Sequence, residues 1–384
     1  MTPPRVFFYV QHLLGIGHLA RANRVAMALA KDGFDVSMVT GGGDVPGFPD
    51  ASLRQITLPT VSSSDAGFSG LVDAGGAPVD EAFKIARRDK LIAAFEAVQP
   101  DIVITEAYPF GRRQMRFELI PLLERIAATR PKPLLFASIR DILQARTKPG
   151  RDAESADLVT QHFDGVLVHG DPGFARLEDT YPLAHQIAEK VHYTGLVAPS
   201  ATDASEEQLD ILVSAGGGAV GGAINGAALE AATILSETLR WVVVTGPNLP
   251  ASEFDRLSRH ADQLTNVTIQ RFRTDFNALM SATRVSISQA GYNTVCDILR
   301  AEARSVLVPF AAGGETEQSV RAERLAARGR VSVIPEDELT SDALAEAITT
   351  ELGRQGGFSQ EANLEGANET ARILRGLLGR QTGA

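Results

Sequence analysis

The stretch Ser288-Gln289-Ala290-Gly291-Tyr292-Asn293-Thr294-Val295-Cys296-Asp297 decides how the second half of the chain folds. It follows the short apolar run 285–287, which is typical of a buried parallel strand, and continues into a segment with helical spacing of apolar residues. Gly291 therefore falls at a strand-to-helix turn. Such a turn brings backbone N–H groups and the positive helix end to the carboxyl edge of a sheet, where anions bind. A glycine needed only for packing would give the same pattern, so both interpretations stay open here.

Two further polar loops are predicted at the same edge. The strand-like run 305–310 leads to Glu317 and Gln318, which could contact a sugar. The run 210–214 leads to Gly216, Gly217 and Gly218, and a helix should start near residue 222. A glycine-rich turn of this kind exposes N–H groups and admits a diphosphate.

The first half of the chain opens with a βαβ pattern. A strand is predicted over 6–10, a helix over 19–32 and a second strand over 35–40. His18 stands at the turn before the helix, where the helix N-terminus would keep the imidazole neutral and suited to act as a general base. A histidine that only hydrogen-bonds the loop is the alternative. Gly15 and Gly17 match part of a dinucleotide fingerprint but its third glycine is missing, which does not favour NAD.

Residues after the next buried strand are expected at the same edge as His18. Glu106 directly follows that strand, which is predicted over 101–105. It could orient His18, as a carboxylate does in a catalytic dyad, or could be a plain surface carboxylate. Arg112, Arg113 and Arg116 follow it, among apolar residues. These arginines could hold a polyanionic acceptor, contact a membrane surface or form a solvated helix face.

Length and composition predict a globular protein of two α/β domains. The chain has 384 residues, with 44% hydrophobic and 22% charged residues. Two βα-repeating halves are expected over 1–200 and 201–384, as doubly wound parallel sheets facing a central cleft, and the last helix, about 362–378, could pack back on the first half. The other histidines, such as His169, are interpreted as structural.

Charge and cysteine content limit the partners and the compartment. A net charge of −10 argues against nucleic acid as a partner. The single Cys296 excludes an internal disulfide framework, and a reducing, cytoplasmic location is expected. No run of 18 apolar residues and no signal peptide are found, so membrane contact is expected to be peripheral at most.

The chain resembles glycosyltransferase family 28, the branch of the GT-B superfamily that includes the cell-wall enzyme MurG, and within it a bacterial group of predicted glycosyltransferases. The resemblance covers nearly the whole chain. It is strongest over the quoted stretch, Val308-Pro309-Phe310 and Glu317-Gln318, which stand in the family's order. Gly15-x-Gly17-His18 matches the N-terminal motif in position, with fewer glycines than the family has.

The resemblance implies a role for each matching residue. Gly216, Gly217, Gly218, Ala290 and Gly291 would approach the diphosphate of a nucleotide-sugar donor, most often linked to UDP. Phe272 and Arg273 would meet the base, and Asp297 the ribose, where the family has the longer Glu. Glu317 and Gln318 would bind the donor sugar, although the family often has Gln at the first of them. His18 would be the base, with Glu106 as its partner. Arg112 and Arg113 would contact the acceptor, which could be lipid-linked, or the membrane.

The expected reaction is an inverting, metal-independent sugar transfer to an acceptor hydroxyl, with no cofactor. It needs a base on the acceptor and charge stabilisation on the leaving group. No clustered metal-ligand spacing occurs in the sequence. Two alternatives stay open: a nucleotide-sugar hydrolase or epimerase on the same scaffold, and a non-catalytic nucleotide-sugar sensor.

Overall fold

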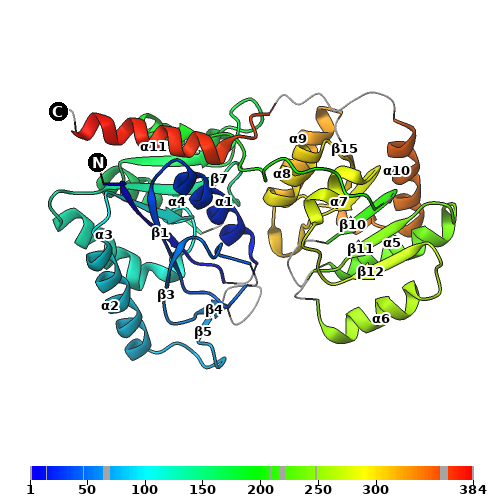
Figure 1. Ribbon diagram of the computed structural model, residues 1–384, viewed down its shortest axis with the longest axis horizontal. Helices are drawn as coiled ribbons and strands as arrows, with labels where there is room; N and C mark the ends of the chain where they lie inside the picture. Colours follow the sequence, from blue (N-terminus) through cyan, green and yellow to red (C-terminus); the bar gives the residue numbers. More distant parts are fainter. Residues whose placement is uncertain are drawn as a thin grey trace. The chain divides into compact units, whose positions relative to one another are not determined.

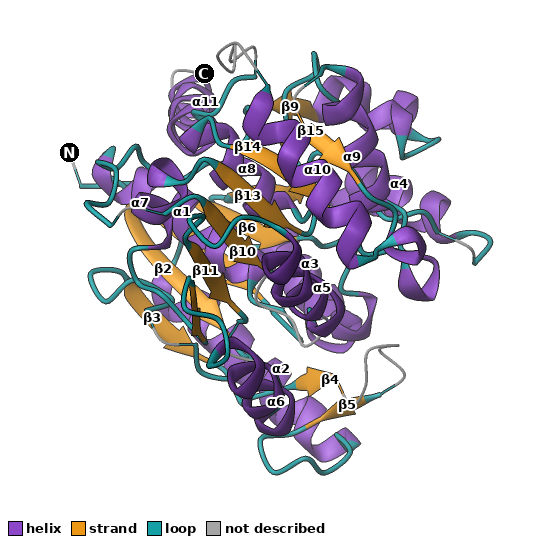
Figure 2. Ribbon diagram, turned by 90° about the vertical axis from the view of Figure 1, so that its right-hand side faces the viewer, coloured by secondary structure: helices purple, strands orange, loops and turns teal. Residues whose placement is uncertain are grey.

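The chain forms two compact units, each a parallel β-sheet covered by helices (Figure 1). The computed structural model describes residues 2–13, 15–45, 47–63, 70–146, 148–207, 209–215, 221–246, 249–329, 331–354 and 362–382. The first unit comprises Met1–Val197 and Glu365–Ala384, and the second comprises Ala198–Leu364. In Figure 2 the strands of the two sheets are orange and the helices around them purple.

The sheet of the first unit has seven strands, all paired in parallel, in the order β3-β2-β1-β6-β7-β8-β9. Their bounds are β1 Arg5–Val10, β2 Asp35–Thr40, β3 Arg54–Thr57, β6 Ile102–Glu106, β7 Leu134–Arg140, β8 Gly165–His169 and β9 Val191–Tyr193. A separate antiparallel pair joins β4 (Ser62–Ser63) to β5 (Leu71–Val72). The predicted strands are confirmed within two residues. The edge strand β3 was missed because its sequence, Arg-Gln-Ile-Thr, is mostly polar and exposed.

Helices pack on both faces of this sheet because its central strands are apolar on both sides. Phe7 and Tyr9 of β1 join a core that includes residues of α2 and α3. The alternate residues of β1, such as Phe8, point to the opposite face, where α1 contacts the strand. The helices are α1 Gly17–Lys31, α2 Glu81–Val98, α3 Arg116–Ala128, α4 Arg151–His162 and α11 Gly366–Thr382, with short 3₁₀ turns η1 Arg113–Met115, η2 Leu177–Asp179 and η3 Ala184–Lys190. Helix α1 begins two residues earlier than predicted, so His18 lies in its first turn.

The sheet of the second unit has six parallel strands in the order β12-β11-β10-β13-β14-β15. The strands are β10 Ile211–Ser214, β11 Trp241–Val244, β12 Val267–Gln270, β13 Val285–Ser288, β14 Arg304–Leu307 and β15 Val331–Val333. The helices are α5 Gly222–Ile234, α6 Ala251–Ala261, α7 Phe276–Ala282, α8 Tyr292–Ala301, α9 Glu317–Ala327 and α10 Ser341–Gly353, with 3₁₀ turns η4 Ala312–Gly314 and η5 Glu336–Glu338. The predicted turn at Gly291 is confirmed, because β13 ends at Ser288 and α8 begins at Tyr292.

Each sheet reverses its strand order once, and the candidate site residues follow the strands at these points. In the first unit the reversal lies between β1 and β6, and in the second between β10 and β13. In open parallel sheets, ligands bind outside the carboxyl ends of the strands at the reversal. His18 and Glu106 flank the first reversal, and the 289–291 loop flanks the second.

The last helix, for which the sequence analysis left open a return to the first half, belongs to the first unit. Glu365 pairs with Val197 in an antiparallel bridge, and the Gly366 N–H donates to the Leu196 carbonyl over 3.0 Å. Helix α11 then packs against α1, as Figure 1 shows, and Arg375 stacks over the Phe34 ring at 4.7 Å. The close approach at its start requires a residue without a side chain.

We expect Gly366→Ala to destabilise the first unit. A Cβ at this position would lie 2.8 Å from the Leu196 carbonyl carbon and closer still to the Gly195 carbonyl oxygen. These are backbone atoms that cannot move aside, so the cost should be about 1–3 kcal/mol. The matched control is Gly376→Ala in the same helix, where nothing lies within 4 Å and alanine should stabilise by about 0.5–1 kcal/mol. Thermal unfolding that shifts in the same direction for both variants would contradict this packing.

Candidate active site

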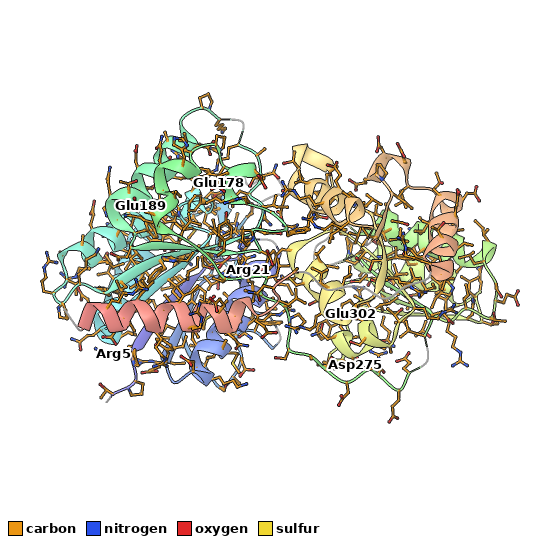
Figure 3. The ribbon with its side chains drawn as sticks, turned by 90° about the horizontal axis from the view of Figure 1, so that it is seen from above. Arg5, Arg21, Glu178, Glu189, Asp275 and Glu302 are labelled. Atoms are coloured by element: carbon orange, nitrogen blue, oxygen red, sulfur yellow. The ribbon has the colours of Figure 1, made fainter. Side chains whose placement is uncertain are left out.

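His18 and Glu106 form a hydrogen-bonded pair at the strand reversal of the first unit. His18 Nδ1 lies 2.9 Å from Glu106 Oε1. The Glu106 side chain is fully buried, and 21% of the His18 side chain is exposed. Arg21, one turn further along α1 and labelled in Figure 3, also donates to Glu106 Oε1 and is buried. The carboxylate is therefore internal, and the alternative of a surface carboxylate does not hold.

The hydrogen bond determines which ring nitrogen of His18 can act as a base. A carboxylate only accepts hydrogen bonds, so Nδ1 must carry the proton that it donates to Glu106. The lone pair of a neutral ring then lies on Nε2. Burial and the nearby Arg112 guanidinium lower the pKa of His18 to about 3, although Glu106 opposes them. The imidazole is therefore neutral at physiological pH, which is the form a general base needs.

Glu106 keeps its charge although it is buried. Burial raises the pKa of this carboxyl, but Arg21 and the hydrogen bonds from His18 and Ser138 outweigh it and bring the pKa to about 2. Ser138 Oγ donates to Glu106 Oε2 over 2.5 Å. Both carboxylate oxygens are thus occupied, and the position of the group toward His18 is fixed.

The polar contacts continue beyond Glu106 across three more strand ends. Ser138 at the end of β7 lies 3.0 Å from Nε2 of His169, the last residue of β8. His169 Nδ1 lies 2.9 Å from Thr194 Oγ1, just after β9. All of these side chains are buried, and burial lowers the pKa of His169 to about 3. We call this chain of contacts, from His18 through Glu106, Ser138 and His169 to Thr194, the buried polar chain.

Sequence reasoning missed Arg21, Ser138 and Thr194 and gave His169 only a structural role. Each is a single polar residue in or beside an apolar segment, without a motif. One signal was present: Glu106, Ser138 and His169 each stand in the last two or three residues of a buried strand. Neighbouring parallel strands place such residues side by side once the strand order is known.

The two arginines predicted to contact an acceptor lie in the loop and 3₁₀ turn after β6. Arg112 Nε donates to the Gln11 carbonyl over 2.7 Å, and the backbone of Arg112 is left-handed, with φ at 57°. Arg113 forms an ion pair with Glu154 of α4. Arg116, at the start of α3, pairs with the same carboxylate.

In the second unit, two helices begin with glycine beside the strand reversal. Gly291 precedes α8 and Gly221 precedes α5, and neither helix has an acidic residue in its first turn. Glycine has no side chain with which to cap the first N–H groups, so these helix ends suit an anion. Gly216, Gly217 and Gly218, expected beside them, lie outside the described residues.

The 288–292 loop is held by the first turns of α9. Gln318 Oε1 accepts hydrogen bonds from the N–H groups of Ala290, over 3.0 Å, and Phe310, over 3.1 Å. Arg321 donates to the Ala290 carbonyl over 2.9 Å and pairs with the buried Glu317 over 2.6 Å. The structure thus brings Ala290, Glu317 and Gln318 together. Gln318 contacts Ala290 directly, and Glu317 is linked to it through Arg321. Arg321 was not singled out from the sequence.

The remaining predicted donor residues lie on separate elements of the second unit. Phe272, in the loop after β12, is 54% exposed. Arg273 next to it pairs with Glu207 over 2.9 Å and with Asp275 over 2.7 Å. Asp297 is half-buried in the second turn of α8.

The described residues show neither a cluster of metal ligands nor a membrane-spanning helix. They contain no group of three or more His, Cys, Asp or Glu side chains placed to hold a metal ion. In the same residues, no helix combines the length and apolar character needed to cross a membrane. Cys296 is buried, as its place in α8 predicted.

Residues 211–371 match the glycosyltransferase family 28 C-terminal domain. The chain carries a family 28 glycosyltransferase domain. Among curated proteins it is similar to a UDP-N-acetylglucosamine–N-acetylmuramyl-(pentapeptide) pyrophosphoryl-undecaprenol N-acetylglucosamine transferase of Exiguobacterium sp., with 29% identity over 59% of this chain and 61% of that protein. The same-named protein of Phenylobacterium zucineum is 30% identical over 38% of each chain. The chain therefore spans about three fifths or less of the length of these two relatives.

Solved structures show the fold over the full length. A calicheamicin glycosyltransferase covers 99% of both chains with a TM-score of 0.65 and 16% identity. MurG of Acinetobacter baumannii covers 98% of this chain and 100% of its own, with a TM-score of 0.60 and 17% identity. The two doubly wound sheets are thus of the GT-B type, which confirms the fold expected from the sequence. The match of residues 211–371 confirms the resemblance to family 28.

We predict that acid destabilises the first unit through His169. Its pKa is about 3 in the folded chain and near 6.5 when unfolded, so the unfolded chain binds the extra proton between these values. Stability is therefore complete above pH 6.5 and falls as the pH drops toward 3, by about 2 kcal/mol between pH 6.5 and 5.

The measurement compares thermal unfolding at pH 7, 6 and 5 for the unaltered protein and for His169→Gln. Glutamine does not titrate, and its amide supplies a hydrogen-bond donor and an acceptor in place of the ring nitrogens. His185→Gln, an exposed histidine of the same unit, is the control. We expect a shallower loss of stability with acid in His169→Gln alone. Equal pH slopes in all three proteins would contradict a buried neutral His169.

Proposed function

We propose that the protein is an inverting, metal-independent glycosyltransferase that moves a sugar from a UDP-linked donor to an acceptor hydroxyl. The observation that carries the proposal is the His18–Glu106 pair in a chain with a family 28 domain. His18 offers a neutral Nε2, and Glu106 fixes the ring from behind. To take a proton from the acceptor, His18 needs a free lone pair on Nε2, and the hydrogen bond to Glu106 keeps the ring in that tautomer.

In the proposed reaction, the acceptor oxygen attacks the anomeric carbon of the donor sugar as its proton passes to His18 Nε2. The bond from that carbon to the diphosphate oxygen breaks, and the nucleoside diphosphate leaves with the electron pair. Attack opposite the leaving group inverts the anomeric centre. The helix N-termini after Gly221 and Gly291 would stabilise the departing diphosphate in place of a metal.

The donor is assigned to the second unit and the acceptor to the first. In this assignment Gly216, Gly217, Gly218, Ala290 and Gly291 approach the diphosphate. Asp297 binds the ribose, Phe272 and Arg273 meet the base, and Glu317 and Gln318 define the sugar side. The curated relatives' names include a pyrophosphoryl-undecaprenol acceptor. By analogy, we propose a lipid-linked acceptor and a cytoplasmic protein that contacts the inner face of the cytoplasmic membrane.

A thermal-shift panel of UDP, GDP, dTDP, ADP and NAD, each with and without magnesium, tests the donor assignment. The proposal expects a shift with UDP that does not need the metal. A shift with GDP or dTDP alone would refute UDP as the carrier and keep the mechanism. A shift with NAD alone, or with none of the five, would refute the transferase.

We predict separate effects for the two central residues. Asp297→Ala should weaken UDP binding about tenfold or more, because it removes a charged hydrogen-bond partner of the ribose. His18→Ala should leave UDP binding unchanged and lower turnover by about 100- to 10,000-fold, the range for losing a general base.

Calorimetry gives the UDP affinity, and UDP release from a panel of UDP-sugars with acceptor extracts gives the turnover. Asp255→Ala in α6 and His185→Ala in η3, both exposed, are the matched controls. Equal loss of UDP binding in Asp297→Ala and His18→Ala would contradict the assigned roles. UDP release at one rate with and without acceptors would indicate a hydrolase instead.

A further inference from the structure

Five arginine side chains of the first unit converge on one pocket with a volume of about 390 Å³. They come from the loop after β6, from η1 and α3, from the loop after β7, and from the start of α4. The five are Arg112, Arg113, Arg116, Arg146 and Arg151. Ser155, Gln114 and the ring of Phe110 complete much of the lining, and we call the whole the arginine pocket.

The arginine pocket has more positive than negative charge. Glu154 lines it and pairs with both Arg113 and Arg116. Asp152 pairs with Arg146 over 3.1 Å. Within the described ranges, neither Arg112 nor Arg151 forms an ion pair. Two carboxylates thus pair with three of the five guanidinium groups, and only one of the two, Glu154, lines the pocket. Such an excess of positive charge favours an added anion.

The guanidinium groups are held in place before any ligand arrives. Arg146 donates to the carbonyl of Phe110, to the carbonyl of Arg151 over 2.9 Å and to Ser155 Oγ over 2.8 Å. Arg112 is fixed through its Nε to Gln11, which leaves its two terminal NH₂ groups as further donors. Pre-positioned donors cost less entropy when a ligand binds.

Arg112 also links the arginine pocket to the candidate base. It ends the six-residue loop that follows Glu106, and its charge is the strongest electrostatic influence that lowers the pKa of His18. Burial lowers the pKa of Arg112 itself to about 10, and Arg140 adds a repulsion that Glu106 opposes. A bound anion would offset the cost of desolvating this half-buried cation.

We propose that the arginine pocket binds a phosphate or diphosphate ester carried by the acceptor, and so holds the acceptor next to His18. The planar N–H forks of arginine match phosphate oxygens in pairs, which a compact ammonium does not. The role in the acceptor rests on the proposed transfer reaction, whereas phosphate binding by these residues does not depend on it.

The test measures pyrophosphate binding to the full chain by calorimetry at physiological salt, with UDP saturating so that the donor site of the second unit is occupied. We expect the double variant Arg146→Gln/Arg151→Gln to bind pyrophosphate at least about tenfold more weakly, because charged hydrogen bonds are lost. The control is Arg125→Gln on the same unit, an exposed arginine that pairs with Glu96. Its affinity should not change.

A second variant, Glu154→Gln, keeps the proposal testable if the arginine double variant does not fold. Glu154→Gln removes the carboxylate that occupies Arg113 and Arg116, so pyrophosphate should bind several-fold more tightly. Pyrophosphate binding that is absent, or that neither variant changes, would overturn the proposal. UDP affinity should be unchanged in both variants, because the donor site lies in the second unit. Failure of the arginine pocket would therefore appear in pyrophosphate binding, and failure of the donor site in UDP binding.

Two further arms identify the source of the phosphate. Co-sedimentation with phosphatidylcholine vesicles, with and without phosphatidic acid, tests a lipid-borne phosphate, and calorimetry with glucose 1-phosphate tests a soluble ester. Binding in either arm that Arg146→Gln/Arg151→Gln weakens supports the proposal and assigns the source. Equal binding by the double variant in both arms, or preferential binding of an acidic peptide, would contradict it.

Discussion

The first unit depends on a buried negative charge at Glu106. A carboxylate removed from water costs several kcal/mol unless it is paired and fully hydrogen-bonded. Here Arg21 supplies the opposite charge, and His18 and Ser138 supply hydrogen bonds to its two oxygens. Because these partners come from α1 and β7, the charge on β6 links three elements beside the strand reversal. It also leaves His18 with one defined tautomer.

The second unit uses backbone groups where the first uses side chains. Its strand reversal is flanked by α5 and α8, which both begin after glycine, and their N–H groups attract negative charge. Gln318 and Arg321 of α9 hold the loop between β13 and α8 through both peptide groups of Ala290. The fold thus offers a candidate base in one unit and a candidate anion site in the other, which are the two elements that the proposed sugar transfer requires.

The sequence was sufficient to predict the parallel strands, the glycine turns and the positions of His18 and Glu106. Apolar runs of strand length and glycines after them are local signals, so one sequence carries them. The buried polar chain is different, because Ser138, His169 and Thr194 meet only through the order of the strands. The sequence around each of these residues contains no signal that shows which residue of a neighbouring strand it contacts. The sequence suggested that α11 could pack on the first half, and the backbone contact at Gly366 shows how it does so.

The arginine pocket could also be predicted only in part from the sequence. Arg112 and Arg113 stood out in the sequence because they follow Glu106, whereas Arg146 and Arg151 lie beyond the next strand and had no motif. Only the fold brings the two groups together. The excess of positive charge is then a property of the pocket, although the chain as a whole is acidic.

The state of the His18 ring tests the account most directly. Nitrogen-15 NMR of the histidine-labelled protein, with His18→Gln to assign the signal, reports both the tautomer and the charge as the pH is lowered from 7.5 to 5. The account predicts a neutral ring protonated on Nδ1 over this whole range, since the pKa of His18 is about 3. A ring that titrates near its ordinary pKa of 6.5, or that carries its proton on Nε2, would contradict His18 as the base that Glu106 positions.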